Sequence, residues 1–191
     1  MLTACATPPP QQVENVCSIF HQYPKWYDAA QQCQKRWGVP ISVQMAFMHQ
    51  ESRFDATAKP PRSTMLGFIP WTRPSTAYGY SQALDGTWDL YRQETGQTFV
   101  NRDNFADASD FIGWYSKAAR ERAGIPPNDP FRLYLAYHEG VGGYQQKTYL
   151  QKSWLIDVAR KVKARALSYQ SQLSRCEQDF TQKSWAQKIF G

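Results

Sequence analysis

The chain has 191 residues, 42% of them hydrophobic and 15% aromatic, which is enough to bury the core of one domain. Its net charge of +6 suits an anionic partner such as the cell wall, nucleic acid or lipid headgroups. No apolar run reaches the roughly 18 residues that a membrane span needs. No motif supports nucleic-acid binding. One late segment gathers basic residues in the manner of a solvated helix face: Arg160, Lys161, Lys163 and Arg165.

The N-terminus carries a possible anchoring signal. Leu2-Thr3-Ala4-Cys5 resembles a bacterial lipobox, in which the cysteine is lipidated, and residues 6–12 read as a polar, proline-rich tether. Only Met1 and Leu2 precede this motif, so the interpretation places the printed start inside a longer precursor; the alternative is an accidental match. Ala6 after the cysteine resembles lipoproteins sorted to the outer membrane. We therefore expect a lipid anchor at Cys5 on the periplasmic face of the outer membrane of a Gram-negative bacterium.

Three cysteines remain. An odd number in an oxidising compartment indicates one disulfide and one free thiol. Cys33 shares a helical face with Trp26 and Trp37, which predicts a buried thiol. Cys17 and Cys176 are then expected to pair, and closing so long a loop contributes roughly 4–5 kcal/mol in the chain-entropy model. No cysteine lies in a CxxC pair or beside a histidine, so neither zinc binding nor thiol catalysis is expected. We expect no cofactor and no metal.

Taken in order, the chain reads as almost wholly helical. Predicted helices cover 13–21, 24–37, 40 to about 52, 85–95 with Asp85 as its cap, 103–123, a segment from Asp129-Pro130 through Tyr137, and 152–175. Glycines end several of them. We expect an all-α fold with residues 1–23 as an N-terminal extension, 24–176 as the domain and 177–191 as a loosely attached tail.

Residues 55–78 interrupt this helical pattern. Four prolines exclude a regular helix there: Pro60, Pro61, Pro70 and Pro74. A short β-hairpin within residues 64–82 stays open. The stretch is also rich in apolar side chains. It suits a wall or lid of a cleft, with Trp71 as a surface for a sugar ring, or a packed surface loop, or a membrane-facing patch.

One carboxylate has an unusual position. Apolar side chains point to nearly every side of a helix at Val43 and at residues 45–48, which predicts a buried central helix. Glu51 falls in its last turn, where the helix dipole and desolvation both raise the pKa of a carboxyl group. A carboxyl that stays protonated near neutral pH serves as the general acid of a glycosidase. The alternative is an ordinary solvated glutamate at a helix end.

Three short motifs, in order, carry a family resemblance. Glu51-Ser52-Arg53-Phe54 resembles the Glu-Ser-x-Phe motif of the soluble-lytic-transglycosylase family, which cleaves peptidoglycan. Gly79-Tyr80-Ser81-Gln82 resembles its Gly-Leu-Met-Gln segment, and residues 136–140 resemble its Ala-Tyr-Asn-x-Gly segment. The resemblance spans roughly residues 24 to 170. It implies a lysozyme-like helical domain whose partner is the glycan strand of peptidoglycan.

The resemblance also implies a mechanism and a site. In that family one glutamate, here Glu51, first protonates the glycosidic oxygen and then takes the proton of the muramic acid 6-hydroxyl, which attacks the anomeric carbon. The product is a 1,6-anhydro sugar, so no second carboxylate is needed. His138 departs from the family's Asn, and Ser81 from its Met. The implied substrate-binding residues are Ser52, Tyr80, Gln82, Tyr137, His138 and Trp154.

Two other functions stay open at this stage. If Glu139 faces Glu51 across a cleft, it can activate a water molecule, and the protein is then a hydrolysing muramidase. A wall-binding or assembly lipoprotein that keeps the fold without turnover is the other alternative. Replacing Glu51 by Gln distinguishes an enzyme from such a scaffold.

Overall fold

The computed structural model describes residues 7–60, 64–65, 69–70 and 75–190. Within this part it confirms the all-α fold. The helices are α1 (Val16–Gln22), α2 (Pro24–Trp37), α3 (Ile41–Ser52), α4 (Asp85–Thr95), α5 (Phe105–Ala123), α6 (Pro130–Gln145), the 3-10 helix η1 (Thr148–Gln151) and α7 (Ser153–Phe190). Two short strands, β1 (Thr64–Met65) and β2 (Ile69–Pro70), pair antiparallel inside the range left open for a hairpin.

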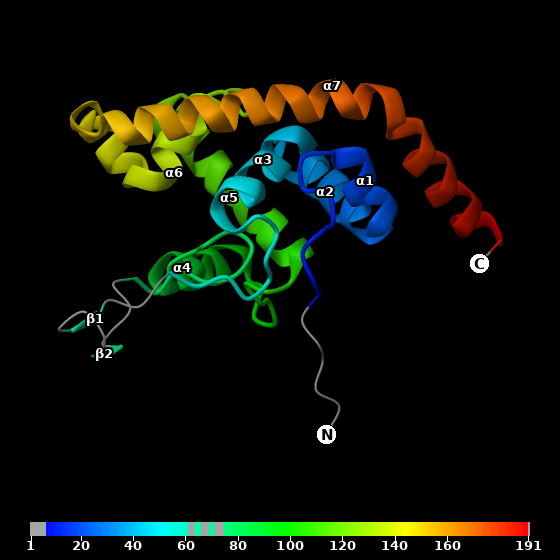
Figure 1. The fold of residues 1–191 in the computed structure, drawn as a ribbon, viewed down its shortest axis with the longest axis horizontal. Coiled ribbons are helices and arrows are strands. Elements are labelled where there is room, and N and C mark those ends of the chain that lie inside the picture. The colour runs from blue at the N-terminus through cyan, green and yellow to red at the C-terminus, as the bar shows by residue number, and fades with distance from the viewer. Residues whose placement is uncertain (1–6, 61–63, 66–68, 71–74, 191) are drawn as a thin grey trace.

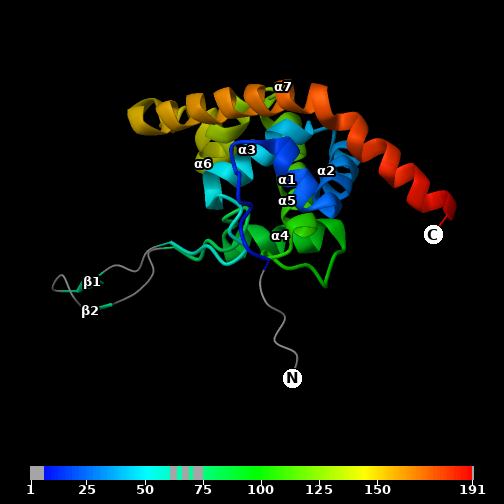
Figure 2. The same ribbon diagram turned by 45° about the vertical axis from the view of Figure 1, so that its right-hand side comes forward.

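The helices pack around α3 and α5. The long α7 lies along one side of the molecule and packs against α1, α3 and α6, while α5 packs against α2 and α6 (Figure 1). α4 lies on the opposite side from α7, and the β1–β2 pair projects away from the helices, as the turned view confirms (Figure 2). Among the described residues, no helix combines the length and apolar character that crossing a bilayer requires.

The predicted central helix is confirmed. Every side chain of α3 from Ile41 to His49 is buried. The helix then ends abruptly, because Arg53 (φ 51°) and Phe54 (φ 64°) both take left-handed backbone angles. This turn sends the fully buried Phe54 into the core, where its ring lies 6.0 Å from that of Trp26. Two successive non-glycine residues in this conformation cost energy, which the burial of Phe54 helps to offset.

Helix starts were predicted with mixed success. Asp129 caps α6 as expected, since its carboxylate accepts a hydrogen bond from the Arg132 amide at 3.1 Å. Asp85 is instead the first residue of α4, and its amide donates to the hydroxyl of Thr76 at 3.1 Å. The amide Oδ1 of Asn104 caps α5, which begins at Phe105, two residues later than expected. The start of α5 thus has a side-chain cap, whereas α4 has none and its first amide bonds to a distant hydroxyl.

The proline-rich segment before α1 is not a free tether from Pro8 onward. Pro10 is buried. The Tyr23 hydroxyl donates to the Pro8 carbonyl at 2.8 Å, and the Gln11 amide donates to the Gln22 side chain at 3.1 Å. Residues 8–11 are therefore held against the body rather than forming a free tether, because Pro8 and Gln11 have partners at Tyr23 and at the end of α1.

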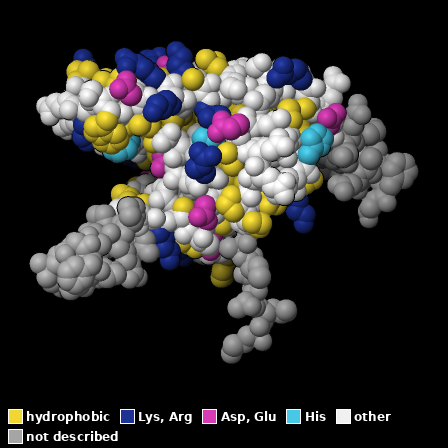
Figure 3. Space-filling view, in the orientation of Figure 1, with side chains coloured by type: hydrophobic (Ala, Val, Ile, Leu, Met, Phe, Trp, Pro, Cys, Tyr) yellow, Lys and Arg dark blue, Asp and Glu magenta, His cyan; other side chains and the backbone are white. Residues whose placement is uncertain are grey.

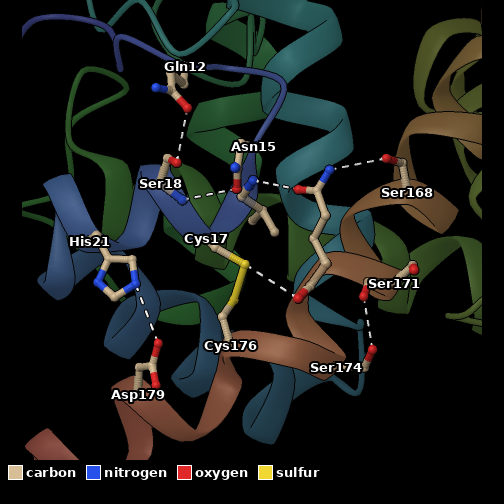
Figure 4. The surroundings of a disulfide bond; sticks show 12 residues. Gln12, Asn15, Cys17, Ser18, His21, Ser168, Ser171, Ser174, Cys176 and Asp179 are labelled. Carbon is tan, nitrogen blue, oxygen red and sulfur yellow. Dashed lines mark hydrogen bonds and ion pairs between the residues drawn. A yellow bond between two sulfur atoms is a disulfide. The ribbon is translucent and has the colours of Figure 1, made fainter.

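The predicted disulfide is confirmed. Cys17 on α1 is bonded to Cys176 on α7, so the bond joins elements separated by 159 residues (Figure 4). The remaining described cysteine, Cys33, is free and buried, and its thiol donates to the Ser109 carbonyl at 3.1 Å. Burial raises the pKa of this thiol to about 12, which makes it unreactive.

The C-terminal segment differs from expectation. α7 does not end near Arg175 but continues to Phe190. Phe180 is buried, with its ring 5.7 Å from that of Phe20 and 5.1 Å from that of Tyr27. Asp179 lies 3.5 Å from His21 (Figure 4). Residues up to Phe180 therefore pack on the body, although 24–176 and 177–191 stay predictions as domain boundaries.

Candidate active site

Two helices face each other at the predicted catalytic carboxyl. Phe47 and Glu51 are four residues apart on α3, and Tyr134 and Tyr137 are three apart on α6, so each pair shares a helix face. The rings of Tyr134 and Tyr137 meet that of Phe47 edge to face at 5.4 Å and 5.3 Å. Glu51, one turn beyond Phe47, thus projects beside two tyrosines.

The pKa of Glu51 is raised to about 7. Desolvation by burial is the dominant cause, and a hydrogen bond from the Tyr134 hydroxyl opposes it in part by stabilising the carboxylate. Glu51 also raises the pKa of Tyr137 well above its usual value, although burial is the larger cause there. A carboxyl with a pKa near neutrality exchanges its proton readily in both directions, as a combined acid and base must.

The segment from Gly79 to Gln82 forms the third side of the site. Gly79 has φ 73°, and a Cβ there would lie 2.1 Å from the Arg102 carbonyl oxygen, so only glycine fits. Gln82 also has a left-handed φ of 50°. Tyr78 and Ala83 form an isolated antiparallel bridge, so the segment turns back on itself.

Side chains from both helices hold this segment. The Ser52 hydroxyl donates to the Tyr80 carbonyl at 2.9 Å, and the Tyr137 hydroxyl donates to the Ser81 carbonyl at 2.6 Å. The Gln82 amide nitrogen lies 2.9 Å from the carbonyl oxygens of both Ala58 and Gly79. The three polar residues taken from the motifs are therefore brought together, and each orients the backbone around Glu51.

A pocket of about 290 Å³ opens beside this arrangement. Figure 3 shows the molecule hollowed between the α6–η1–α7 corner and the α4 side. Its walls come from α4, α5, α6 and the segment before α4: Gln82, Ala83, Leu84, Thr87, Phe111, Tyr115, Tyr137, His138, Glu139 and Gly140. Tyr137 thus lies between Glu51 and a space that can hold part of a ligand.

Tyr80 does not occupy the predicted position. Its side chain is 1% exposed and packs 5.5 Å from the Trp26 ring and 5.8 Å from that of Phe105. The prediction that the Tyr80 side chain binds substrate is wrong, because the left-handed turn at Gly79 directs the ring inward and leaves only its carbonyl near the site. Ser81 is likewise fully buried.

His138 and Trp154 lie at the surface. Trp154 is 53% exposed, so it does not form the floor of the cleft. Its ring meets that of His138 edge to face at 5.1 Å. Because His138 also lines the pocket, the two rings mark its outer edge.

Glu139 is occupied by other partners. Its carboxylate accepts from the Lys152 ammonium at 2.7 Å and from the Thr148 hydroxyl, and lies 3.1 Å from His138 Nδ1. The hydrogen bond from Lys152 is the main reason why the pKa of Glu139 falls to about 2. A carboxylate held ionised in this way is a poor base for activating water.

Sequence reasoning missed Tyr134. Only its spacing of three residues before Tyr137 on a helix signalled that it shares the same face. Two predicted residues, Cys5 and Trp71, lie outside the described residues. In the described part of the chain, no group of three His, Cys, Asp or Glu side chains is arranged to hold a metal ion.

An all-α fold with a partly buried glutamate of raised pKa, faced by two tyrosines, is the arrangement expected of a glycan-cleaving class of protein. A family model described as the transglycosylase SLT domain matches residues 1–176. The chain therefore belongs to the transglycosylase SLT domain family, and its function is of the lytic-transglycosylase type, acting on peptidoglycan. A comparison with curated proteins found no match.

Proposed function

We propose that this protein is a peptidoglycan lytic transglycosylase that cleaves the β-1,4 bond between MurNAc and GlcNAc and leaves 1,6-anhydro-MurNAc ends. The observation that carries the proposal is the pKa of Glu51, raised to about 7 by burial beside Tyr134. Near neutral pH such a carboxyl is present in both protonation states, and both are needed in one catalytic cycle.

The reaction balances with this one carboxyl group. Protonated Glu51 gives its proton to the glycosidic oxygen as the bond to the anomeric carbon breaks, and GlcNAc leaves as an alcohol. The Glu51 carboxylate then takes the proton from the MurNAc 6-hydroxyl, whose oxygen bonds to the anomeric carbon. Glu51 ends protonated, ready for another turnover, and no water is consumed.

Neighbouring groups support this sequence of steps. The hydrogen bond from Tyr134 stabilises the carboxylate formed after the first proton transfer. Tyr137, Ser52 and Gln82 fix the backbone from Gly79 to Gln82. A backbone fixed before substrate arrives loses little freedom on binding, which favours the reactive geometry.

A hydrolysing muramidase is the second candidate, with Glu139 activating water. The ion pair of Glu139 with Lys152 and its lowered pKa disfavour that role. Mass spectrometry of muropeptides released from purified sacculi tests the choice. Products lighter by one water than reducing-end equivalents support the transglycosylase, whereas reducing ends would overturn it. No release by wild-type protein would favour a non-catalytic wall-binding lipoprotein.

We further propose that Cys5 is lipidated and anchors the domain to the periplasmic face of the outer membrane. The disulfide between Cys17 and Cys176 supports an oxidising compartment such as the periplasm. Because the body begins at Pro8, only a short span separates Cys5 from the folded domain. Labelling with a fatty-acid analogue should mark the wild-type protein and not Cys5→Ser; equal labelling would refute the anchor.

A further inference from the structure

Glu139 is a buried carboxylate for which the proposed reaction has no use. Its side chain is 3% exposed, although Lys152 beside it is 41% exposed and His138 is 36% exposed. Burying a charge is costly unless it is paired and hydrogen-bonded, and Glu139 meets both conditions through Lys152 and Thr148. Such an arrangement holds the groups around the carboxylate in fixed positions.

Glu139 and its partners lie along the passage from α6 through η1 to the start of α7. Glu139 lies on α6, Thr148 opens η1, and Lys152 follows η1 immediately before α7. Directly after Glu139 the backbone leaves helical geometry, because Gly140 has φ 73° and ψ 155°. The carboxylate therefore ties together the corner at which the chain passes from α6 to α7, the corner above the hollow in Figure 3.

This corner presents an exposed aromatic surface. Trp154 is 53% exposed, and its only ring contact in the described part of the chain is with His138. His138 is fixed in turn by the contact of its Nδ1 with Glu139 at 3.1 Å. Because His138 lines the pocket next to Tyr137, the indole in contact with His138 lies beside the pocket wall. A flat apolar ring at such an edge suits the C–H face of a sugar.

We propose that Glu139 is a positioning residue: through His138 and Lys152 it holds Trp154 as an outlying sugar-binding surface at the edge of the cleft. The inference rests on the proposed transglycosylase function and names a further contact with the same glycan strand. Its physical basis is preorganisation. Without the carboxylate, His138 and the start of α7 lose a shared contact. Ligand binding must then also order Trp154, and this cost makes the free energy of binding less favourable.

Kinetics on soluble glycan strands of several disaccharides test this role. Glu139→Gln should raise KM about threefold to tenfold and leave kcat within about twofold, because only binding common to ground and transition state is lost. Trp154→Ala should raise KM similarly. The double variant should bind no worse than Trp154→Ala alone, because both changes remove one contact. Lys152→Arg should keep the wild-type KM, whereas Lys152→Met should raise it.

Asp157→Asn is the matched control. It breaks an ion pair with Arg160 on the same helix, at 2.7 Å and with both side chains more than half exposed, and should leave KM unchanged. A fall in kcat at constant KM in Glu139→Gln would overturn the proposal by assigning Glu139 to the chemistry. Additive effects of Glu139→Gln and Trp154→Ala would overturn it too, by separating the two residues.

Two further measurements keep the test decisive. If Glu139→Gln does not fold, other variants allow the same comparison. Thr148→Val and Lys152→Met each remove one hydrogen-bond donor to Glu139, whereas Lys152→Arg keeps it. If wild-type protein releases no anhydro products, the proposed function fails. Dissociation constants for the same strands then test positioning separately, and equal constants for wild type and Trp154→Ala would refute it.

Discussion

Replacing Glu51 by Gln should stabilise the protein while greatly reducing its activity. The pKa of Glu51 lies at about 7 in the folded protein, against an ordinary value of 4.5. Since the pKa is higher in the folded protein, folding favours the protonated carboxyl group. The contribution of Glu51 to the free energy of unfolding is therefore fully present below pH 4.5 and is lost as pH rises through 7. At 1.36 kcal/mol per unit of pKa, ionised Glu51 lowers the free energy of unfolding by roughly 3 kcal/mol at pH 8.

The glutamine side chain carries no charge at any pH, so the Glu51→Gln variant should escape this penalty. At pH 8 its unfolding midpoint should exceed that of wild type by on the order of 10 °C, with little difference at pH 4. Circular dichroism during heating measures both midpoints. In parallel, kcat on glycan strands should fall by about 10²–10⁴-fold.

Glu121→Gln provides the control, because Glu121 is exposed and forms a surface ion pair with Lys117 at 3.2 Å. Its midpoint should change little at either pH. A gain for Glu51→Gln that is equal at pH 4 and pH 8 would show that the raised pKa is not its cause. No gain at pH 8 would show that Glu51 is solvated, as the ordinary interpretation of a helix-end glutamate holds.

Three further changes test the fold and the site. Cys17→Ser should lower the free energy of unfolding by up to about 5 kcal/mol, and a reductant should shift the wild-type midpoint equally but not that of the variant. Gly113→Ala should lower the free energy of unfolding by about 1–3 kcal/mol, because the added methyl would lie 2.3 Å from an indole atom of α2. Gly86→Ala meets no atom within 4 Å and should be tolerated, so equal urea midpoints for the two variants would contradict this packing. Tyr134→Phe removes the hydrogen bond that lowers the pKa of Glu51, so the alkaline fall of kcat/KM should move to higher pH; a move to lower pH would refute this contact.

Most helices could be predicted from local signals. Gly38, Gly96 and Gly124 end α2, α4 and α5 where expected, each with a left-handed backbone that glycine adopts without strain. The apolar side chains that residues 43 and 45–48 place on nearly every side of the helix predicted the burial of α3. At Asp85 the predicted cap was wrong, and the oxygen that accepts from its amide belongs to Thr76, nine residues earlier in the chain.

Site residues could be predicted only in part. Glu51, Ser52, Gln82 and Tyr137 were found because their motifs are short and continuous in sequence. The burial of Tyr80 could not be seen, because the direction of its ring depends on a left-handed turn at Gly79.

By itself, the sequence determined the helical class, the cysteine pair and the single carboxyl at the end of an apolar helix, because these depend on periodicity, residue type and chain position. Only the tertiary structure decided that Tyr134 hydrogen-bonds Glu51 and that Lys152 holds Glu139 ionised. Both contacts join residues from different parts of the fold. The charge state of a carboxyl depends on the groups that folding brings within a few ångströms of it, and no local pattern encodes them.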